Sequence, residues 1–360
     1  IRKGLNPWGG KYNVTSCAKE ISEKCDDMAG QTVSVAGRLT AFRGHGKATF
    51  ADLRDRTGRV QLHARVDVLG EQSYADFTDL LDLGDIVGIK GVVFRTKRGE
   101  PTVEVREWTM LSKCLRPLPE KWHGLTDVDL RYRQRYLDLI VNPEVQDTFV
   151  KRTRIISYIR KYLDERGFLE VQTPVLQSIA GGAHARPFIT HHNALDIDMY
   201  MRIATELYLK RLLVGGLERV YEIGPNFRNE GIDTKHSPEF YMLEVYQAYA
   251  DYNDMMDLVE EMISGCAMEV LGTTKLRAEG HEIDLTPPWK RLKVWDGITQ
   301  LCGIRPEDLR DDQDAKAVVE KLQLKMDKAV TVGSVIDKLL DQYVEPSLIE
   351  PTFLMDYPVE

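Results

Sequence analysis

Residues 219–249 read RVYEIGPNFRNEGIDTKHSPEFYMLEVYQAY, and this stretch decides the fold of the chain. Two long β-type runs, Arg219–Ile223 and Phe240–Tyr249, lie on either side of a loop in which polar and charged residues crowd together. Apolar runs of this length bounded by Gly, Pro and Asn are typical of strands. The segment therefore predicts two strands whose connecting loop is rich in functional groups.

Four side chains in and beside this loop suit a nucleotide ligand. Arg228 and Glu230 are two residues apart at the end of the first run, and His236 and Phe240 stand opposite them. A guanidinium is a planar fork for phosphate, a carboxylate accepts hydrogen bonds, and an aromatic ring offers a stacking surface. Together they predict an adenine-nucleotide site.

The sequence around this segment predicts an α+β domain. Ile155, Ile156, Ile159, Tyr162 and Leu163 recur at the spacing of one helix face, and Gly167 ends that helix. We expect further strands at Phe168–Val171 and Met199–Ala204, and helices at about Glu206–Val214 and Asn253–Leu271.

Short β runs fill residues 31–108 and predict a small barrel of five strands. The OB-fold is a five-stranded barrel that binds oligonucleotides, although the pattern alone equally fits a barrel without a ligand. Pro117 and Pro119 then interrupt regular structure. We expect a barrel domain at residues 1–114, a linker at 115–145 and the α+β domain at 146–360.

Composition narrows the class of protein. Hydrophobic residues make up 43% and charged residues 29% of the 360, which is typical of a folded globular chain. No apolar run approaches the ~20 residues of a membrane span, so we expect no membrane association. The net charge of −8 divides into +3 for residues 1–114 and −11 for the rest. The net charge of +3 on residues 1–114 permits contact with nucleic acid but does not require it.

Cysteine usage indicates a reducing compartment. The chain has five cysteines, an odd number, and no CxxC pair. This argues against both a disulfide framework and a cysteine-rich zinc site. We therefore expect a cytoplasmic protein.

Several motifs taken together resemble the class II lysyl-tRNA synthetases. They are the linker Leu115–Pro119, the run Arg131–Asp138, the stretch Gly181–Asn193, the run Ala204–Lys210, the loop Phe227–Glu230 and Glu244–Tyr246. The resemblance covers nearly the whole chain. It implies an anticodon-binding OB domain followed by a class II catalytic domain on an antiparallel sheet. It also implies ATP and Mg²⁺ as cofactors, L-lysine and tRNA(Lys) as partners, and a homodimer with residues 150–174 at its interface.

The same resemblance assigns roles around ATP. Arg228 would bind the α-phosphate of ATP and the carboxylate of the amino acid, a task that suits a bidentate guanidinium. Glu230 would accept from the adenine amino group, Phe240 would stack on adenine, and His236 would meet the γ-phosphate. No protein nucleophile is implied, because catalysis rests on positioning and charge stabilisation.

An amino-acid pocket is implied next to this site. By resemblance, Glu206 and the Gly182 backbone would hold the α-amino group of lysine, while Glu244 and Tyr246 would hold its ε-amino group. Side chains two apart on a strand share a face, which puts Glu244 and Tyr246 together. An aspartate pocket would need fixed cations instead. On its own, however, Glu206 could simply stabilise the start of a helix.

For the barrel, the resemblance implies reading of a U-rich anticodon. Phe50 would stack on a base, and Gln61 and Glu100 would bond to base edges. Two structural alternatives stay open, since Phe50 could be a core aromatic and Glu100 could belong only to a turn.

The chain stops before some expected features. We expect the glycine-rich motif 3 and the acidic magnesium ligands beyond Glu360, so no metal ligand is expected within residues 1–360, and the sequence reads as truncated. A non-catalytic tRNA-binding protein, a tRNA-independent lysine ligase, and an aspartyl- or asparaginyl-tRNA synthetase are the alternatives.

Overall fold

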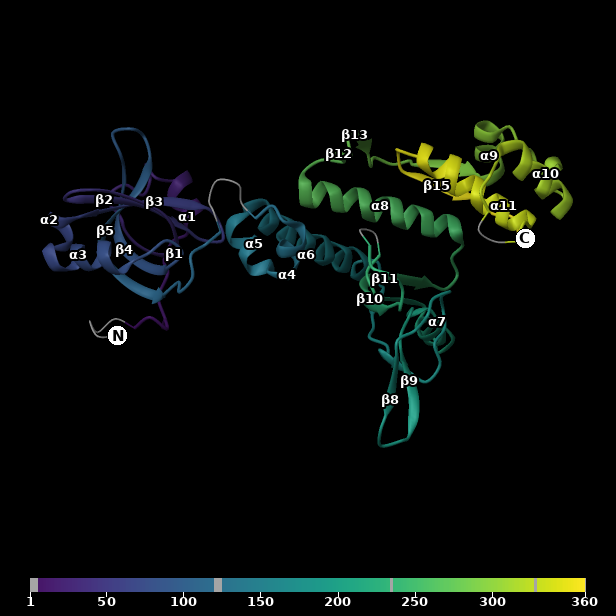
Figure 1. The fold of residues 1–360 in the computed structure, drawn as a ribbon, viewed down its shortest axis with the longest axis horizontal. Helices are drawn as coiled ribbons and strands as arrows, with labels where there is room; N and C mark the ends of the chain where they lie inside the picture. The colour runs from purple at the N-terminus through teal and green to yellow at the C-terminus, as the bar shows by residue number, and fades with distance from the viewer. Residues whose placement is uncertain (1–5, 120–124, 234–235, 327–328, 360) are drawn as a thin grey trace. The chain divides into compact units, whose positions relative to one another are not determined.

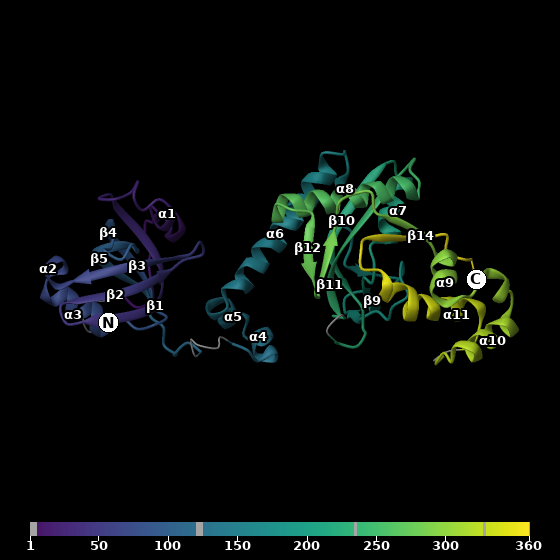
Figure 2. The same ribbon diagram turned by 90° about the horizontal axis from the view of Figure 1, so that it is seen from above.

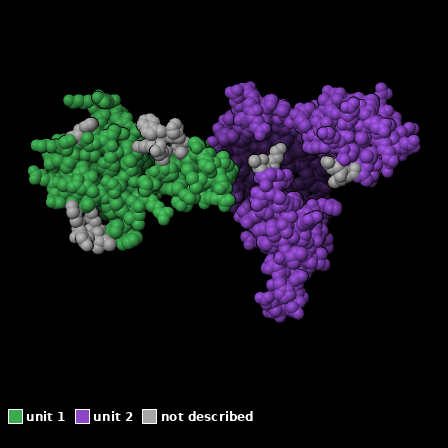
Figure 3. Space-filling model, viewed as in Figure 1, with its two compact units in different colours: residues 1–147 green, residues 148–360 purple. Residues whose placement is uncertain are grey.

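The structure is a computed structural model that describes residues 6–119, 125–233, 236–326 and 329–359. The chain forms two compact units, Ile1–Asp147 and Thr148–Glu360, which Figure 3 colours separately. The chain ends, Ile1 and Glu360, lie outside the described residues. Among the described residues, no helix combines the length and the apolar character needed to cross a bilayer.

Five strands of the first unit close into a barrel in the order β1-β2-β3-β5-β4 (Figure 1). Their bounds are β1 Thr32–His45, β2 Ala48–Arg54, β3 Arg59–Arg65, β4 Ile86–Arg95 and β5 Pro101–Ser112. The β3–β5 pair is parallel and the other four pairs are antiparallel. All five β runs expected from the sequence are therefore strands.

Side-chain alternation fills the barrel. On β3, Val60, Leu62 and Ala64 are buried, whereas Gln61 and His63 between them face outward. This is the period of two that a half-buried strand requires. The outward residues of β3 are thus available for contacts outside the core.

Short helices complete the first unit. They are α1 Ala18–Glu23, α2 Val66–Leu69, α3 Glu71–Leu80, α4 Val128–Arg133 and α5 Arg135–Val141. Tyr74 and Phe77 of α3 are buried in the barrel core, and Trp108 of β5 packs against that core. The buried Asp138 of α5 is held by Arg131, Arg135 and Asn142.

The second unit is built around β10 and β11. The helix α6 Pro143–Asp164 begins in the first unit and has most of its length in the second. The other elements of the second unit are β6 Leu169–Glu170, β7 Leu176–Gln177, β8 Ile189–His192, β9 Ile197–Met201, α7 Glu206–Val214, β10 Arg219–Phe227, β11 Glu239–Gln247, α8 Tyr252–Leu271, β12 Lys275–Ala278, β13 His281–Asp284, β14 Lys290–Lys293, α9 Val294–Cys302, α10 Asp312–Leu322, α11 Val332–Leu339 and β15 Thr352–Met355. The segment from β14 to β15 has its own apolar core.

The prediction of an antiparallel catalytic sheet is only partly right. β10 and β11 are antiparallel, but β6 pairs with β10 in parallel, so the sheet β11-β10-β6 is mixed. The physical reason lies in the connection. After α6 the chain turns at Gly167, which has φ +75°, and β6 then runs in the direction of β10.

The two faces of the β10–β11 ribbon carry different kinds of side chain, apolar on one face and polar on the other. Figures 1 and 2 show α8 beside these strands. Tyr221, Ile223, Leu243 and Val245 pack with side chains of α6 and α8 in one apolar cluster. Because side chains alternate, Glu222, Glu244 and Tyr246 belong to the opposite face. The apolar face fixes the ribbon, and the polar face carries the site.

Candidate functional site

Arg228 and Phe240 lie at the end of the β10–β11 ribbon where the loop joins the two strands. The Arg228 guanidinium lies over the Phe240 ring, 5.1 Å from its centroid, and its Nε donates to the Ile203 carbonyl at 3.4 Å. The Arg228 amide donates to the Pro238 carbonyl at 2.9 Å, which ties the two sides of the loop together. A half-buried fork over a ring is a suitable place for a phosphate and a flat base.

Glu230 and His236 lie further out on the same loop and are exposed. The His236 ring Nδ1 lies 2.8 Å from a carboxylate oxygen of Asp233, so Asp233 fixes the orientation of this ring. Glu230 lines an open cavity of about 800 Å³ together with His184 and Arg186. Residues 234 and 235 of this loop are outside the described part of the chain.

Glu244 is held by two hydrogen bonds from uncharged donors. Its Oε1 accepts from the Thr205 backbone N–H at 3.0 Å, and its Oε2 accepts from the Tyr246 hydroxyl at 3.0 Å. Burial, and then the charge of Glu244 and the bond to it, raise the pKa of Tyr246 well above its ordinary value. Tyr246 therefore stays a neutral hydrogen-bond donor to the Glu244 carboxylate.

Gly182 and Glu206 meet at the start of α7. Gly182 has φ +89°, and a Cβ added to it would lie 3.2 Å from the Cβ atoms of Ala204 and Glu206. Only glycine accommodates both this conformation and this approach without strain. The Gly182 backbone thus lies against the first turn of α7, where Glu206 is half-buried and pairs with Lys210.

A buried ion pair supports this region, and sequence reasoning missed it. Arg202 and Glu222 are 2% and 3% exposed and form a direct pair. Arg202 also donates to the Pro225 carbonyl at 2.8 Å, and its own carbonyl accepts from Phe227 N–H at 2.9 Å. These bonds fix the end of β10 one residue before Arg228. No periodicity in the sequence marks residues 202 and 222 as partners.

Two buried polar atoms of the same region have no partner. Among the described residues, these are the Asn226 Oδ1 and the Thr205 Oγ1. Asn226 is on β10 opposite Phe240, and Thr205 precedes α7. Both residues adjoin the candidate site, because Asn226 pairs with Phe240 and the Thr205 N–H donates to Glu244.

The barrel carries an aromatic stack on its outer surface. Phe50 of β2 faces His63 of β3 in register, and their rings stack 4.4 Å apart with an interplanar angle of 7°. The Phe94 ring lies 5.9 Å from His63. Burial, and then the nearby Arg65 charge, lower the pKa of His63. Phe50 therefore belongs to a half-buried stack on the surface and is not a core aromatic. Because side chains two apart on a strand share a face, the prediction that Gln61 faces outward could also have identified His63.

The other two predicted anticodon contacts lie near this stack. Gln61 Oε1 accepts from the Thr102 hydroxyl at 3.0 Å, which orients the amide. Glu100 lies in the turn between β4 and β5 and accepts from Arg59 at 2.8 Å. Arg59 also pairs with the buried Asp52, and so does Arg43. The face thus combines flat rings with fixed polar groups.

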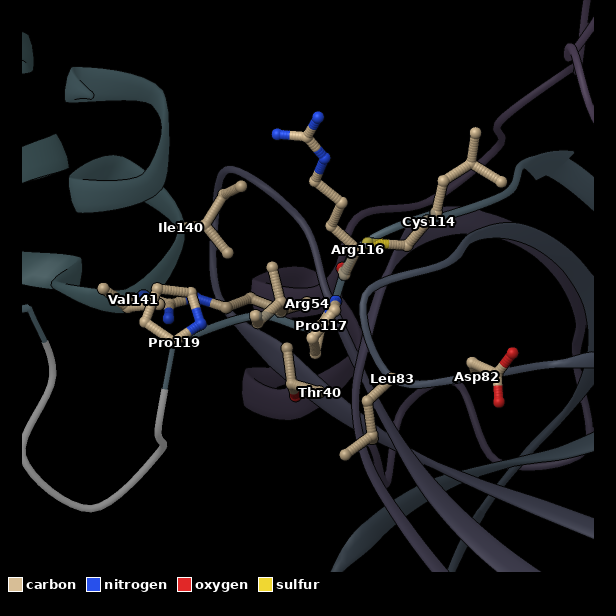
Figure 4. A pocket seen from close by; sticks show the side chains of 12 residues that line it. Thr40, Arg54, Asp82, Leu83, Cys114, Arg116, Pro117, Pro119, Ile140 and Val141 are labelled. Carbon is tan, nitrogen blue, oxygen red and sulfur yellow. Dashed lines mark hydrogen bonds between the residues drawn. The ribbon is translucent and has the colours of Figure 1, made fainter.

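A further pocket of about 620 Å³ lies in the first unit and contains none of the predicted site residues. Figure 4 shows Thr40, Leu83, Cys114 and Pro117 among its lining side chains.

Comparison with known proteins agrees with both units. The family described as tRNA synthetases class II (D, K and N) matches residues 127–360, and the OB-fold nucleic acid binding domain matches residues 33–111. A lysine–tRNA ligase of Moorella thermoacetica is 59% identical, over 99% of this chain and 73% of its own length. A lysine–tRNA ligase of Carboxydothermus hydrogenoformans is 54% identical, over 100% and 74%. The chain therefore belongs to the class II tRNA synthetases of the D, K and N group.

Proposed function

We propose that this protein is a lysine–tRNA ligase, which activates L-lysine with ATP and transfers it to tRNA(Lys). The observation that carries the choice of amino acid is the Glu244 carboxylate. It is oriented by Thr205 and Tyr246, and within the described residues no cationic side chain pairs with it. A pocket with such a carboxylate suits an ammonium group. The relatives that bear this activity match nearly the whole chain.

Activation would take place between the Arg228 fork and the lysine pocket. The lysine carboxylate oxygen attacks the α-phosphorus of ATP, the bond from that phosphorus to the bridging oxygen breaks, and pyrophosphate leaves. Arg228 would hold the α-phosphate and the attacking carboxylate together, and such positioning is the main source of rate. Phe240 would stack on adenine, Glu230 would accept from its amino group, and His236 would meet the γ-phosphate.

Lysine would lie across the polar face of the ribbon. Glu206 and the Gly182 backbone would bind its α-ammonium, while Glu244 and Tyr246 would bind its ε-ammonium. Two carboxylates separated by a phenol match a substrate with two ammonium groups. An aspartate or asparagine side chain would instead face the unbalanced charge of Glu244, which disfavours those two alternatives.

Transfer would follow in the same site. A ribose hydroxyl of the terminal adenosine of tRNA attacks the carbonyl carbon of lysyl-adenylate, and AMP leaves. The barrel would select the tRNA. Phe50, backed by His63, would stack on an anticodon base, and Gln61 and Glu100 would bond to base edges. Aromatic stacking of this kind is worth about 1 to 3 kcal/mol per base.

We expect this reaction to use Mg²⁺ as a cofactor together with ATP. Over the described ranges, no group of three or more His, Cys, Asp or Glu side chains could hold a metal ion. The roles proposed above are those of the side chains and backbone of this chain.

A second copy of this chain is the proposed partner of the second unit. Large apolar side chains are exposed on the segment after α6, namely Leu169, Leu176, Ile179, Ile189, Leu195 and Ile197. Many large apolar side chains exposed within one segment favour an interface, and homodimers are the commonest assemblies. The predicted interface at residues 150–174 overlaps the start of this segment.

ATP–pyrophosphate exchange on the full-length enzyme tests the proposal. Exchange should depend on lysine and should not occur with aspartate or asparagine. Exchange with aspartate or asparagine alone would reject the lysine pocket. Absence of exchange with any amino acid, while tRNA(Lys) still binds, would favour a non-catalytic tRNA-binding protein.

A further inference from the structure

One ammonium group already lies at the proposed lysine pocket. The Lys210 Nζ lies 2.5 Å from the Glu206 Oε1, one helical turn further along α7. The same Nζ is 6.0 Å from the centroid of the Tyr246 ring. Lys210 therefore approaches two of the four groups proposed to bind lysine, and these two groups come from different elements, α7 and β11.

The charges in the pocket divide unequally. Glu244 has no cationic partner among the described residues, whereas the Lys210 ammonium neutralises Glu206. In the free enzyme, Glu244 is thus open to an ammonium group, whereas Glu206 is already paired with the ammonium group of Lys210. A substrate ammonium that binds Glu206 beside the Lys210 ammonium brings two like charges together, and this repulsion favours release of Lys210 from the carboxylate.

We propose that Lys210 is an internal competitor that occupies Glu206 in the free enzyme and that the α-ammonium of lysine replaces on binding. Lys210 is then an affinity-setting residue of the amino-acid site. This inference rests on the proposed lysine activation.

The strength of the contact fits such a replacement. The Lys210 and Glu206 side chains are 55% and 33% exposed, and they are four residues apart on a helix. Exposed pairs at this spacing are weak, so water and a substrate can compete with them. Removing the Lys210 charge should therefore tighten lysine binding by about two- to fivefold.

Lys210→Gln on the full-length enzyme is the direct test. Glutamine keeps a long polar side chain and a similar helix propensity. The KM for lysine in pyrophosphate exchange should fall about two- to fivefold, and the KM for ATP should not change. Lys210→Arg keeps the charge and should leave the KM for lysine close to its original value.

A matched control is available in the first unit. Lys24, the residue after α1, pairs with Glu20 of α1 at the same spacing and in the same order. Lys24→Gln removes an equivalent helical pair far from the amino-acid site in sequence and should leave all exchange constants unchanged.

6-Aminohexanoate, added as a competitor of lysine, tests the two ammonium sites separately. It has the carboxylate and the terminal ammonium of lysine but lacks the α-ammonium. Its inhibition constant should be the same in Lys210→Gln as in the original enzyme. An unchanged or raised KM for lysine in Lys210→Gln, or an equal shift for lysine and 6-aminohexanoate, would overturn the inference. Failure of the original enzyme to activate lysine would instead refute the proposed function.

Discussion

Glu222 and Glu244 lie directly opposite each other on β10 and β11, on the face of the ribbon away from α6 and α8. Two carboxylates in this position repel each other unless each finds a partner. Glu222 is buried with Arg202, whereas among the described residues Glu244 accepts hydrogen bonds only from the Thr205 N–H and the Tyr246 hydroxyl. The fold thus balances one charge internally and leaves the other for a cation, which is the basis of the first prediction.

Glu244→Gln should weaken lysine use and leave tRNA binding unchanged. Glutamine keeps the shape and one acceptor oxygen, but it removes the charge and replaces the second oxygen by an amide donor. Losing a charge-assisted bond costs about 1.5 to 3 kcal/mol, or roughly one to two powers of ten in kcat/KM for lysine. Pyrophosphate exchange measures this loss. Glu239→Gln, at the exposed start of the same strand, is the control and should have no effect.

Arg228→Lys should abolish most adenylate formation. Lysine keeps the positive charge but lacks the planar fork that would join the α-phosphate to the carboxylate. We expect a loss of at least about a hundredfold in the exchange rate, in line with removal of one transition-state donor. Arg211→Lys, on the exposed side of α7, is the matched control. Equal loss of tRNA binding in the Arg228 variant would mean that Arg228 is structural.

How much of the site was predictable from the sequence depends on the distance over which a pattern acts. Strand alternation is local, so it correctly placed Glu244 and Tyr246 together, and their hydrogen bond confirms that placement. Helical spacing is also local, and residues 206 and 210 could have been paired from it. The predicted helix Glu206–Val214 matches α7 at both ends.

Contacts between distant segments were not predictable. The pair of Arg202 with Glu222 joins two segments 20 residues apart, and no sequence pattern in either segment identifies the other as its partner. The parallel pairing of β6 likewise depends on how the chain turns after α6, not on the apolar pattern of β6 itself. Tertiary packing determines which distant residues pair and in which direction two strands run, and the local pattern of a single sequence does not contain this information.

The stability of the barrel should depend on Asp55 at neutral pH. Burial opposes ionisation of Asp55, but hydrogen bonds from Thr57, Ala18 and Gly58 outweigh it and hold the pKa of Asp55 below its ordinary value. A lowered carboxyl pKa in the folded state adds stability above the ordinary pKa of about 4, and this stability disappears as the pH falls through the folded value.

Asp55→Asn should therefore destabilise the protein at pH 7 by on the order of 1 kcal/mol, with the difference shrinking toward pH 3. Urea unfolding at the two pH values measures it. Asp27→Asn, an exposed carboxylate on the same unit, is the control. A difference that grows on acidification would show that the bonds to Asp55 do not favour its charged form.

The exposed apolar segment after α6 should hold two copies together. Ile179 and Ile189 are 76% and 63% exposed, so a charge at either position costs the folded monomer little. In a dimer the same charges would be buried without partners. Ile179→Asp combined with Ile189→Asp should shift the full-length protein from dimer to monomer in sedimentation at micromolar concentration. A monomeric original protein, or an unchanged dimer in the variant, would contradict the assignment.

Phe50→Ala should separate tRNA recognition from amino-acid activation. The Phe50 ring is stacked on His63 at 4.4 Å and is half-exposed, so removing it eliminates a stacking surface without opening the barrel core. We expect tRNA(Lys) affinity to fall by about 1 to 3 kcal/mol, which is roughly five- to 150-fold. Phe50→Leu keeps apolar volume without a flat ring and should lose nearly as much.

The partner ring provides the final comparison. His63→Ala leaves Phe50 in place but removes the ring that holds its plane, so tRNA affinity should fall by less than in Phe50→Ala. His63→Phe should restore it, because a second flat ring supports the stack equally well. Nitrocellulose-filter binding measures these affinities, and tRNA-independent pyrophosphate exchange should stay constant throughout the series. If exchange fell together with tRNA affinity, the stack would be a folding element of the barrel and not a base-binding surface.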